Sequence, residues 1–173
     1  MSDEKIQPRV IAPGLTLLRG GEGRGKTRLL RQLAAEQPID CFFEHPADAA
    51  FDAVVARAWL ARLQPRFAAN WQPAVAAALI KGFGLAEHID KPLFMLSAGS
   101  RRKVGLVAAA ASGATLTLLD TPYAALDARS GRVLNALLIE AAESTERAWV
   151  VADYALPAGL AGVRLAALID LGD

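Results

Sequence analysis

The chain has 173 residues, of which 53% are hydrophobic, and its 19 Lys and Arg residues against 18 Asp and Glu residues leave a formal net charge of +1. This length suits one domain with a sizeable core, so we expect residues 1–173 to form a single unit. The near balance of charge creates no field that would gather nucleic acid or an anionic membrane, so neither is predicted as a partner.

The beginning of the chain and its cysteine usage indicate a cytoplasmic location. The first ten residues, MSDEKIQPRV, lack the apolar core of a secretory signal, and the single Cys41 cannot form an internal disulfide. The longest weakly polar stretch, residues 104–119, is shorter than the about 20 residues that span a bilayer, and Ser112 and Gly113 interrupt it. We expect a buried helix, a turn and a buried strand there.

Five short apolar runs with β-branched or aromatic residues predict strands. They are residues 15–18, 39–43, 115–119, 149–152 and 165–169. Segments of helical periodicity separate these runs, which is typical of an α/β protein with a mainly parallel sheet and helices on both faces.

The strand signal disappears between Pro46 and Leu96. Large apolar residues there recur at every fourth position, which is the spacing of one face of a helix. They are Phe51, Val55, Trp59 and Leu63, and a second helical pattern follows over residues 75–85. The two patterns predict a helical subdomain, residues 46–97, inserted into the α/β core.

Residues 20–27, GGEGRGKT, have the spacing G-x-x-x-x-G-K-[ST] between a predicted strand and a predicted helix. Glycines allow backbone N–H groups to gather around phosphates, and the following helix adds its positive N-terminal end. Lys26 is expected to reach the β- and γ-phosphates, and the Thr27 hydroxyl to bind Mg²⁺. A glycine-rich turn without a ligand is the alternative. Glu22 is expected to face outward, because its negative charge would be unfavourable beside the phosphates. The predicted nucleotide ligands in this segment are Gly20, Gly21, Gly23, Gly25, Lys26, Thr27 and Arg28.

A second glycine motif and two acidic segments follow in a defined order. LSAGS, with Ser97 to Ser100, opens a helical segment, and TLTLLD ends at Asp120 before AALD ends at Asp127. The order of phosphate loop, helical insertion and these three motifs resembles the ATP-binding cassette (ABC) family, over residues 14–152. The resemblance implies a RecA-like P-loop NTPase fold, ATP and Mg²⁺ as cofactors, and ATPase activity. An ordinary helix cap is the alternative meaning of LSAGS.

In the ABC family two cassettes pair head to tail, and the signature of one covers the γ-phosphate bound by the other. The resemblance therefore implies a homodimer with nucleotide at the interface, in which Ser97, Ala98 and Gly99 contact the nucleotide of the partner. Asp120 is expected to hold Mg²⁺ together with Thr27. Asp127 is expected at the dimer seam, or as the cap of the helix that follows it. Residues 101–103, two arginines and a lysine, could approach the phosphates bound by the partner, but they are interpreted as a solvated basic turn and are left out of the site.

Four positions depart from the family pattern. Thr121 replaces the acidic residue that polarises the attacking water, and a threonine hydroxyl can orient a water but cannot act as a base near neutral pH. Asp153 stands where the family has a histidine that contacts the γ-phosphate. Glu44 and His45 occupy the region of the usual glutamine, and no aromatic residue for base stacking precedes Gly20. We therefore assign Thr121 and Asp153 to the catalytic positions and expect slow or impaired hydrolysis.

Three functional hypotheses remain open. The chain is an ABC-type protein that binds Mg-ATP and dimerises with little turnover, or a nucleotide-dependent scaffold or regulator in which hydrolysis is dispensable. The third is the ATPase subunit of a transporter, peripheral at the inner face of the membrane, with a membrane permease on a separate chain. A P-loop kinase is disfavoured because LSAGS and AALD would then have no purpose.

Overall fold

The computed structural model describes residues 10–43 and 45–173. The first nine residues and Glu44 lie outside the described part of the chain. Most of the stretch that indicates a cytoplasmic location, and one of the two residues in the place of the family's glutamine, therefore have no structural description.

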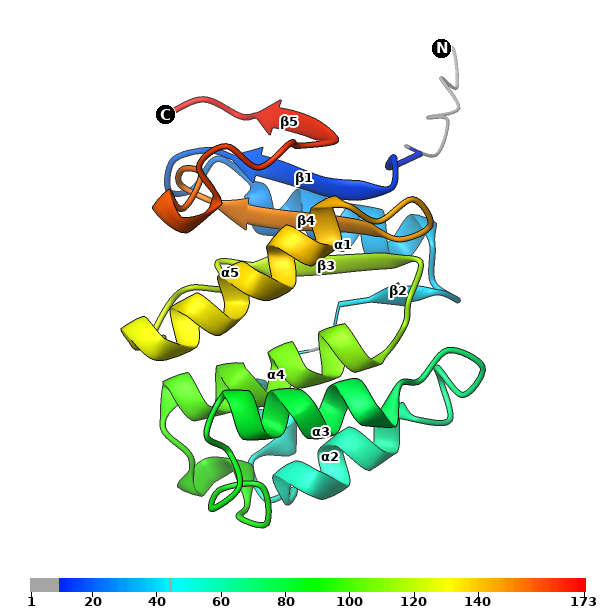
Figure 1. The fold of residues 1–173 in the computed structure, drawn as a ribbon, viewed down its shortest axis with the longest axis vertical. Helices are drawn as coiled ribbons and strands as arrows, with labels where there is room; N and C mark the ends of the chain where they lie inside the picture. The colour runs from blue at the N-terminus through cyan, green and yellow to red at the C-terminus, as the bar shows by residue number, and fades with distance from the viewer. Residues whose placement is uncertain (1–9, 44) are drawn as a thin grey trace.

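The described residues form one sheet of parallel strands in the order β2-β3-β4-β1-β5 (Figure 1). Each strand overlaps one of the five predicted apolar runs, so the predicted α/β class with a mainly parallel sheet is confirmed. Continuous apolar runs suit these strands because helices cover both faces of a parallel sheet. The strands are β1 (Gly14–Arg19), β2 (Cys41–Phe42), β3 (Leu116–Asp120), β4 (Ala148–Asp153) and β5 (Ala167–Asp170).

The register of the central strands brings three loops together at one edge of the sheet. Arg19 at the end of β1 lies opposite Asp153 at the end of β4, and Asp120 at the end of β3 lies opposite Ala152. The Gly20 backbone N–H donates to the Asp153 backbone oxygen over 3.3 Å, which ties the first two loops together. Ligands of open α/β sheets bind at this carboxyl edge.

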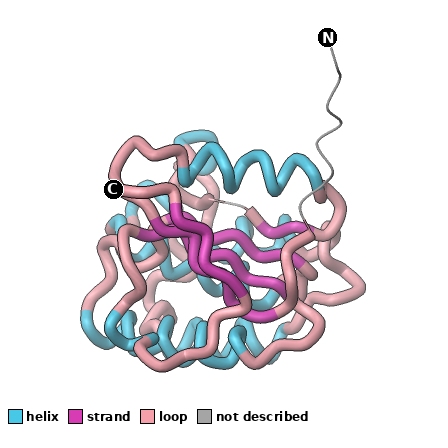
Figure 2. The backbone as a smooth tube through the Cα atoms, turned by 90° about the horizontal axis from the view of Figure 1, so that it is seen from above, coloured by secondary structure: helices cyan, strands magenta, loops and turns pink. Residues whose placement is uncertain are grey.

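Helices cover the two faces unequally, as Figures 1 and 2 show. Helix α1 (Lys26–Glu36) packs on one face against β3 and β4, and α5 (Ala128–Ala142) packs on the other against β1 and β4. The side chains alternate between two apolar clusters, because successive residues of a strand point to opposite faces. The α1 side contains Leu18, Leu30, Leu33, Leu118 and Val150, and the α5 side contains Leu15, Leu119, Leu134, Leu138 and Val151.

Helix α4 (Ala98–Ala111) joins the sheet to the remaining helices. It contacts α2 (Ala56–Leu63), α3 (Pro73–Gly82) and α5, and its residues from Val104 to the end are buried. A helix that is buried on every side is apolar all round, which explains the weakly polar composition of this stretch. The predicted sequence of buried helix, turn and buried strand is confirmed, since β3 follows after Ser112 and Gly113.

The first predicted helix of the insertion is wrong at its N-terminal end. The spacing of four begins at Phe51, but α2 begins at Ala56, and Phe51 belongs to a single 3₁₀ turn (Ala49–Phe51). The Ala56 backbone N–H donates to the Lys91 oxygen over 3.0 Å, and Val55 forms an antiparallel bridge with Pro92. These tertiary bonds fix an extended backbone before α2 in place of a helical one. A separate helical subdomain over residues 46–97 stays a prediction.

The sheet of the described residues is entirely parallel, and these residues form no second, antiparallel sheet. In the same part of the chain, no helix combines the length and the apolar character that crossing a membrane requires.

Candidate nucleotide-binding site

The loop between β1 and α1 adopts backbone angles that favour glycine. Gly23 has φ 73° and Gly25, the residue before α1, has φ 90°. Both lie in the left-handed region, where a side chain with a Cβ is strained. The glycines at these two positions therefore suit the conformation that turns the loop into the helix.

Lys26 is held inside this loop. Its side chain is buried to 8% exposure, and Nζ donates to the backbone oxygens of Gly20 over 2.5 Å and of Gly21 over 2.7 Å. The ring of Tyr154, which follows β4, lies over the same ammonium group with its centroid 4.4 Å from Nζ. Carbonyl oxygens and an aromatic face both attract a cation, so the positive charge of Lys26 is held at the loop.

Thr27 and Asp120 meet across the loop. The Thr27 Oγ1 hydroxyl donates to Asp120 Oδ2 over 2.5 Å, although the residues are 93 positions apart. A hydroxyl and a carboxylate oxygen in contact are the donors that Mg²⁺ prefers, and Mg²⁺ takes only one or two carboxylates from the protein beside phosphates and water. The described residues contain no cluster of three His, Cys, Asp or Glu side chains that could hold a metal, which such a site does not require. These residues fit Mg²⁺.

A cavity of about 370 Å³ opens beside these groups. This volume lies in the range of small-molecule sites. Among the predicted site residues it brings together Gly23, Gly25, Lys26, Thr27, Asp120 and Thr121, and it adds Glu22, Arg24 and Tyr154. Gly20 and Gly21 lie behind it and bind Lys26, and Arg28 is exposed with its guanidinium near Gly25.

Thr121 lies in this cavity with an unusual backbone. Its φ is 43°, and its N–H donates to the Ala152 oxygen over 2.8 Å. The left-handed region is strained for a β-branched residue, so the hydrogen bond to β4 and the following Pro122 hold a conformation that threonine does not favour. The residue after Asp120 thus brings a hydroxyl to the cavity and no carboxylate.

Asp153 is directed elsewhere. Its Oδ1 accepts the backbone N–H of Tyr154 over 2.8 Å, and Asp153 is not among the residues that line the cavity. Its negative charge acts on Tyr123, whose pKa is raised to about 12 first by burial and then by Asp153. The carboxylate stabilises the turn after β4, and the side chain which that turn brings to the cavity is Tyr154.

The signature residues lie outside the phosphate cavity of their own chain. Ser97 caps α4, because its Oγ accepts the backbone N–H of Ser100 over 3.1 Å. Gly99 packs against Ala125, and a Cβ at Gly99 would lie 2.4 Å from the Ala125 oxygen. Only glycine allows this approach, so LSAGS is both a helix cap and a close contact with the loop after β3.

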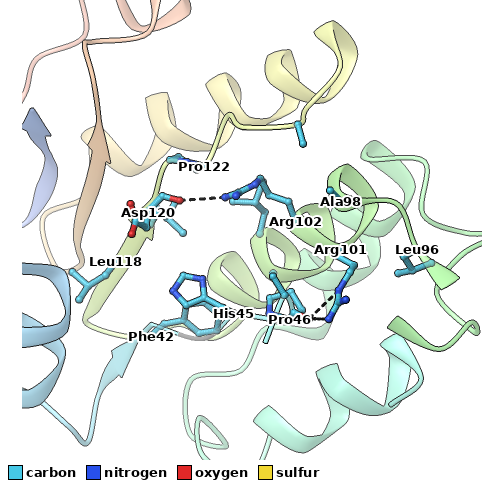
Figure 3. Close-up of a pocket in the computed structure, with 15 residues that line it drawn as sticks. Phe42, His45, Pro46, Leu96, Ala98, Arg101, Arg102, Leu118, Asp120 and Pro122 are labelled. Atoms are coloured by element: carbon cyan, nitrogen blue, oxygen red, sulfur yellow. Dashed lines mark hydrogen bonds between the residues drawn. The ribbon is translucent and has the colours of Figure 1, made fainter. Parts of the chain in front are cut away.

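The interpretation of residues 101–103 as a solvated turn is wrong, because all three side chains are partly buried and bonded. Arg101 donates to the Pro46 oxygen over 3.1 Å and to Asp52 over 2.8 Å, while Lys103 lies 3.3 Å from Asp127. Arg102 crosses from α4 to donate to the Asp120 backbone oxygen over 3.2 Å (Figure 3). The first turn of α4 points its basic side chains toward β3 and the segment before α2, which sequence spacing does not disclose.

Arg102 is a site residue that the sequence patterns missed. Burial lowers its pKa, an effect that the carboxylates of Asp120 and Asp153 oppose, and a guanidinium stays charged in proteins. It lines a second cavity, of about 340 Å³, together with Asp120, Ala98 and Phe42. The sequence signal that could have found Arg102 is its place four residues after Ala98, the spacing at which two helix side chains lie on the same face, and both line this cavity.

Asp127 caps α5, as one of the two predictions for it states. Its Oδ1 accepts the Ser130 backbone N–H over 2.7 Å, and Oδ2 lies 3.3 Å from Lys103 Nζ. The hydrogen bond to Ser130, with a smaller contribution from Lys103, lowers the pKa of Asp127 to about 2. The side chain thereby joins the first turns of α4 and α5.

No protein-family model matches the chain, but curated proteins do. A cytochrome c biogenesis ATP-binding export protein of Cereibacter sphaeroides is 35% identical over 133 residues, which are 73% of this chain and 63% of that protein. A zinc import ATP-binding protein of Halorhodospira halophila is 32% identical over 148 residues, 78% of this chain and 55% of that protein. The chain therefore spans less than two thirds of the length of these relatives.

Solved structures share the fold. A Pyrococcus furiosus protein described as an ABC transporter ATP-binding protein has a TM-score of 0.73 at 17% identity, over 93% of this chain and 86% of that one. An ATP-binding cassette solved as a dimer bound to ADP and Pi has a TM-score of 0.64 at 16% identity, over 86% of this chain and 78% of that one.

The parallel sheet and the glycine-rich loop before α1 define a P-loop nucleotide-binding protein of α/β class. With these relatives and structural neighbours, the chain belongs to the ABC family of ATP-binding proteins. Membership implies binding of ATP and Mg²⁺, and proteins of this family generally hydrolyse ATP, dimerise and pair with permeases.

Proposed function

We propose that the chain binds Mg-ATP in the cavity beside Lys26 and holds it with little turnover. The observation that carries this proposal is the contact between Thr27 Oγ1 and Asp120 Oδ2, 2.5 Å apart, next to the buried ammonium of Lys26. A cation for phosphates and two oxygen donors for Mg²⁺ then lie at one edge of the sheet, where family members bind nucleotide.

The protein groups have distinct tasks in this proposal. The glycine N–H groups and Lys26 bind and orient the phosphates, and Thr27 and Asp120 hold Mg²⁺. The metal supplies positive charge that neutralises the phosphate oxygens. Glu22 is exposed but also lines the cavity beside Lys26, so its outward orientation stays a prediction.

Slow hydrolysis follows from the residue after Asp120. A water that attacks a phosphate needs a group to orient it and to accept its proton, and a positioned base contributes about 10²- to 10⁴-fold in rate. Thr121 offers a hydroxyl in the cavity, and the Asp153 carboxylate is bonded to the backbone of Tyr154. We therefore assign the low turnover to Thr121 and do not assign a base role to Asp153.

The cavity of one copy lacks the signature, which supports a head-to-tail homodimer as the complete site. Ser97, Ala98 and Gly99 are absent from the lining beside Lys26, while the cap of α4 leaves Ser97 exposed. We propose that a second copy contributes these residues to the γ-phosphate, and that bound nucleotide stabilises the pair.

The second candidate function is that of an ATP-binding subunit of a transporter, with the permease on another chain. The names of the relatives describe an export protein and an import protein. The cavity of about 340 Å³ lies between β3 and the helices, where apolar residues such as Phe42 and Leu96 line it. A groove of this kind would suit a docking segment of a membrane protein, and the chain would then act as its ATP-binding subunit.

Calorimetric titration of Mg-ATP into the wild type and Lys26→Ala tests the proposed binding. We expect the variant to bind about 10- to 100-fold more weakly, because a charge-assisted hydrogen bond to phosphate is lost. Lys81→Ala, at an exposed position in the last turn of α3, is the matched control and should bind like the wild type. Wild-type protein that takes up no Mg-ATP, or equal affinity in Lys26→Ala, would contradict the proposal.

A further inference from the structure

The side chain of Tyr154 has no role in the proposed binding and yet lies in the site. It lines the cavity beside Lys26, Thr27 and Thr121, and the residue is 57% exposed. Two features of the fold place it there. Arg19 and Asp153 are in register, so the loop after β4 leaves the sheet beside the phosphate loop, and the Asp153 carboxylate holds the Tyr154 backbone N–H.

The ring of Tyr154 faces the ammonium group of Lys26, which is expected to bind the phosphates. Its centroid lies 4.4 Å from Lys26 Nζ, within the distance of about 6 Å at which an aromatic face attracts a cation. The same ammonium donates to the oxygens of Gly20 and Gly21. In a P-loop protein this lysine reaches the β- and γ-phosphates, so ring and phosphates compete for one charge.

Apart from the side that the Tyr154 ring covers, the described residues around Lys26 Nζ leave little of the ammonium accessible to a ligand. Lys26 is 8% exposed, and the phosphate loop covers it on the side of Gly20 and Gly21. Tyr154 is exposed to a far greater extent and follows the last residue of β4. The ring is therefore more readily displaced from the ammonium than the two loop oxygens are.

We propose that Tyr154 is a positioning residue for Lys26: its ring holds the ammonium in the nucleotide-free protein, and the phosphates of ATP displace the ring when they bind. The inference rests on the proposed binding of Mg-ATP and adds a residue that lowers the affinity for Mg-ATP. Part of the free energy of phosphate binding is then used to separate Lys26 from the ring, so the native affinity is lower than the loop alone would give.

Two substitutions distinguish the effect of the ring on Mg-ATP binding from the effect of the phenol hydroxyl. Tyr154→Ala removes the competing ring and should tighten Mg-ATP binding about two- to five-fold, which is the typical strength of an exposed cation–π contact expressed as an affinity ratio. Tyr154→Phe keeps the ring and should bind Mg-ATP with the same affinity as the wild type. Weaker binding in both variants would instead make the hydroxyl a phosphate ligand and overturn the proposal, as would unchanged affinity in Tyr154→Ala.

NMR spectra of the side chain of Lys26 provide a readout that needs no turnover. Because the ammonium lies over the ring face, we expect upfield-shifted ε-methylene protons in nucleotide-free wild type and Tyr154→Phe, and ordinary shifts in Tyr154→Ala. Mg-ATP should abolish the upfield shift in the wild type. A shift that persists with nucleotide bound would overturn the displacement, whereas wild type that binds no Mg-ATP would overturn the proposed function and this inference together.

Discussion

At the scale of single residues, the candidate site depends on contacts between segments that are distant in the chain, such as Thr27 with Asp120 and Lys26 with Tyr154. The spacing of glycines, Lys26 and Thr27 in one segment predicts a phosphate loop, and Asp120 at the end of an apolar run predicts its partner. The position of Tyr154 over Lys26 depends on which strands are neighbours in the sheet. Local sequence carries no information about that order, and none about the left-handed backbone of Thr121.

Substitution of Thr121 by an acid tests the proposal that this residue makes hydrolysis slow. We expect Thr121→Glu to raise single-turnover ATP hydrolysis toward the about 10²- to 10⁴-fold that a positioned base contributes. Glutamate is not β-branched, so the φ of 43° should be easier for it than for threonine.

Thr121→Gln is the matched control, because it has nearly the same shape without a basic carboxylate. It should hydrolyse ATP as slowly as the wild type. Equal acceleration in both variants would assign the effect to relief of the backbone, and no acceleration in Thr121→Glu would remove Thr121 as the cause of slow turnover.

At the scale of helices and strands, the type of each element could be predicted from the sequence, but the residues at which it begins and ends could be predicted less well. All five strands of the described residues follow from apolar runs, and α5 buries Leu134, Leu138 and Ala141, which are spaced three or four residues apart. The start of α2 differs because Lys91 and Pro92 bond to the segment before it. The basic residues at the start of α4 were misinterpreted for a similar reason, since their acceptors come from distant segments.

The cap of α5 gives a stability prediction at this scale. The pKa of Asp127 is about 2 in the folded protein, below the unfolded value near 3.8, so its ionised form stabilises the fold above pH 4. That contribution is lost as the pH falls from about 4 to 2. We expect Asp127→Asn to lower the midpoint of urea unfolding at pH 7, with the difference from wild type shrinking over this window.

Lys103→Ala separates the two partners of Asp127. The hydrogen bond to Ser130 has the larger effect on the pKa of Asp127, so this variant should keep most of the pH dependence between pH 4 and 2. A difference between wild type and Asp127→Asn that does not change with pH would show that the carboxylate charge at the cap is not what stabilises α5.

At the scale of the whole molecule, the phosphate cavity and the LSAGS segment of one copy lie apart. The phosphate cavity lies at the ends of β1, β3 and β4, and the signature begins α4, on the other side of the loop that contains Ala125. The ABC resemblance predicted this separation, and the geometry of one chain supports it. The chain also spans less than two thirds of the length of these curated relatives.

The most direct measurement of the proposed nucleotide-held pair is the molar mass in solution by light scattering, with and without saturating Mg-ATP. The account predicts the mass of one chain, 18.3 kDa, without nucleotide and about twice that mass with it. With the proposed slow turnover, the dimer should persist through the measurement, and Lys26→Ala should remain at the mass of one chain. A wild-type mass of 18.3 kDa at saturating Mg-ATP would contradict the account.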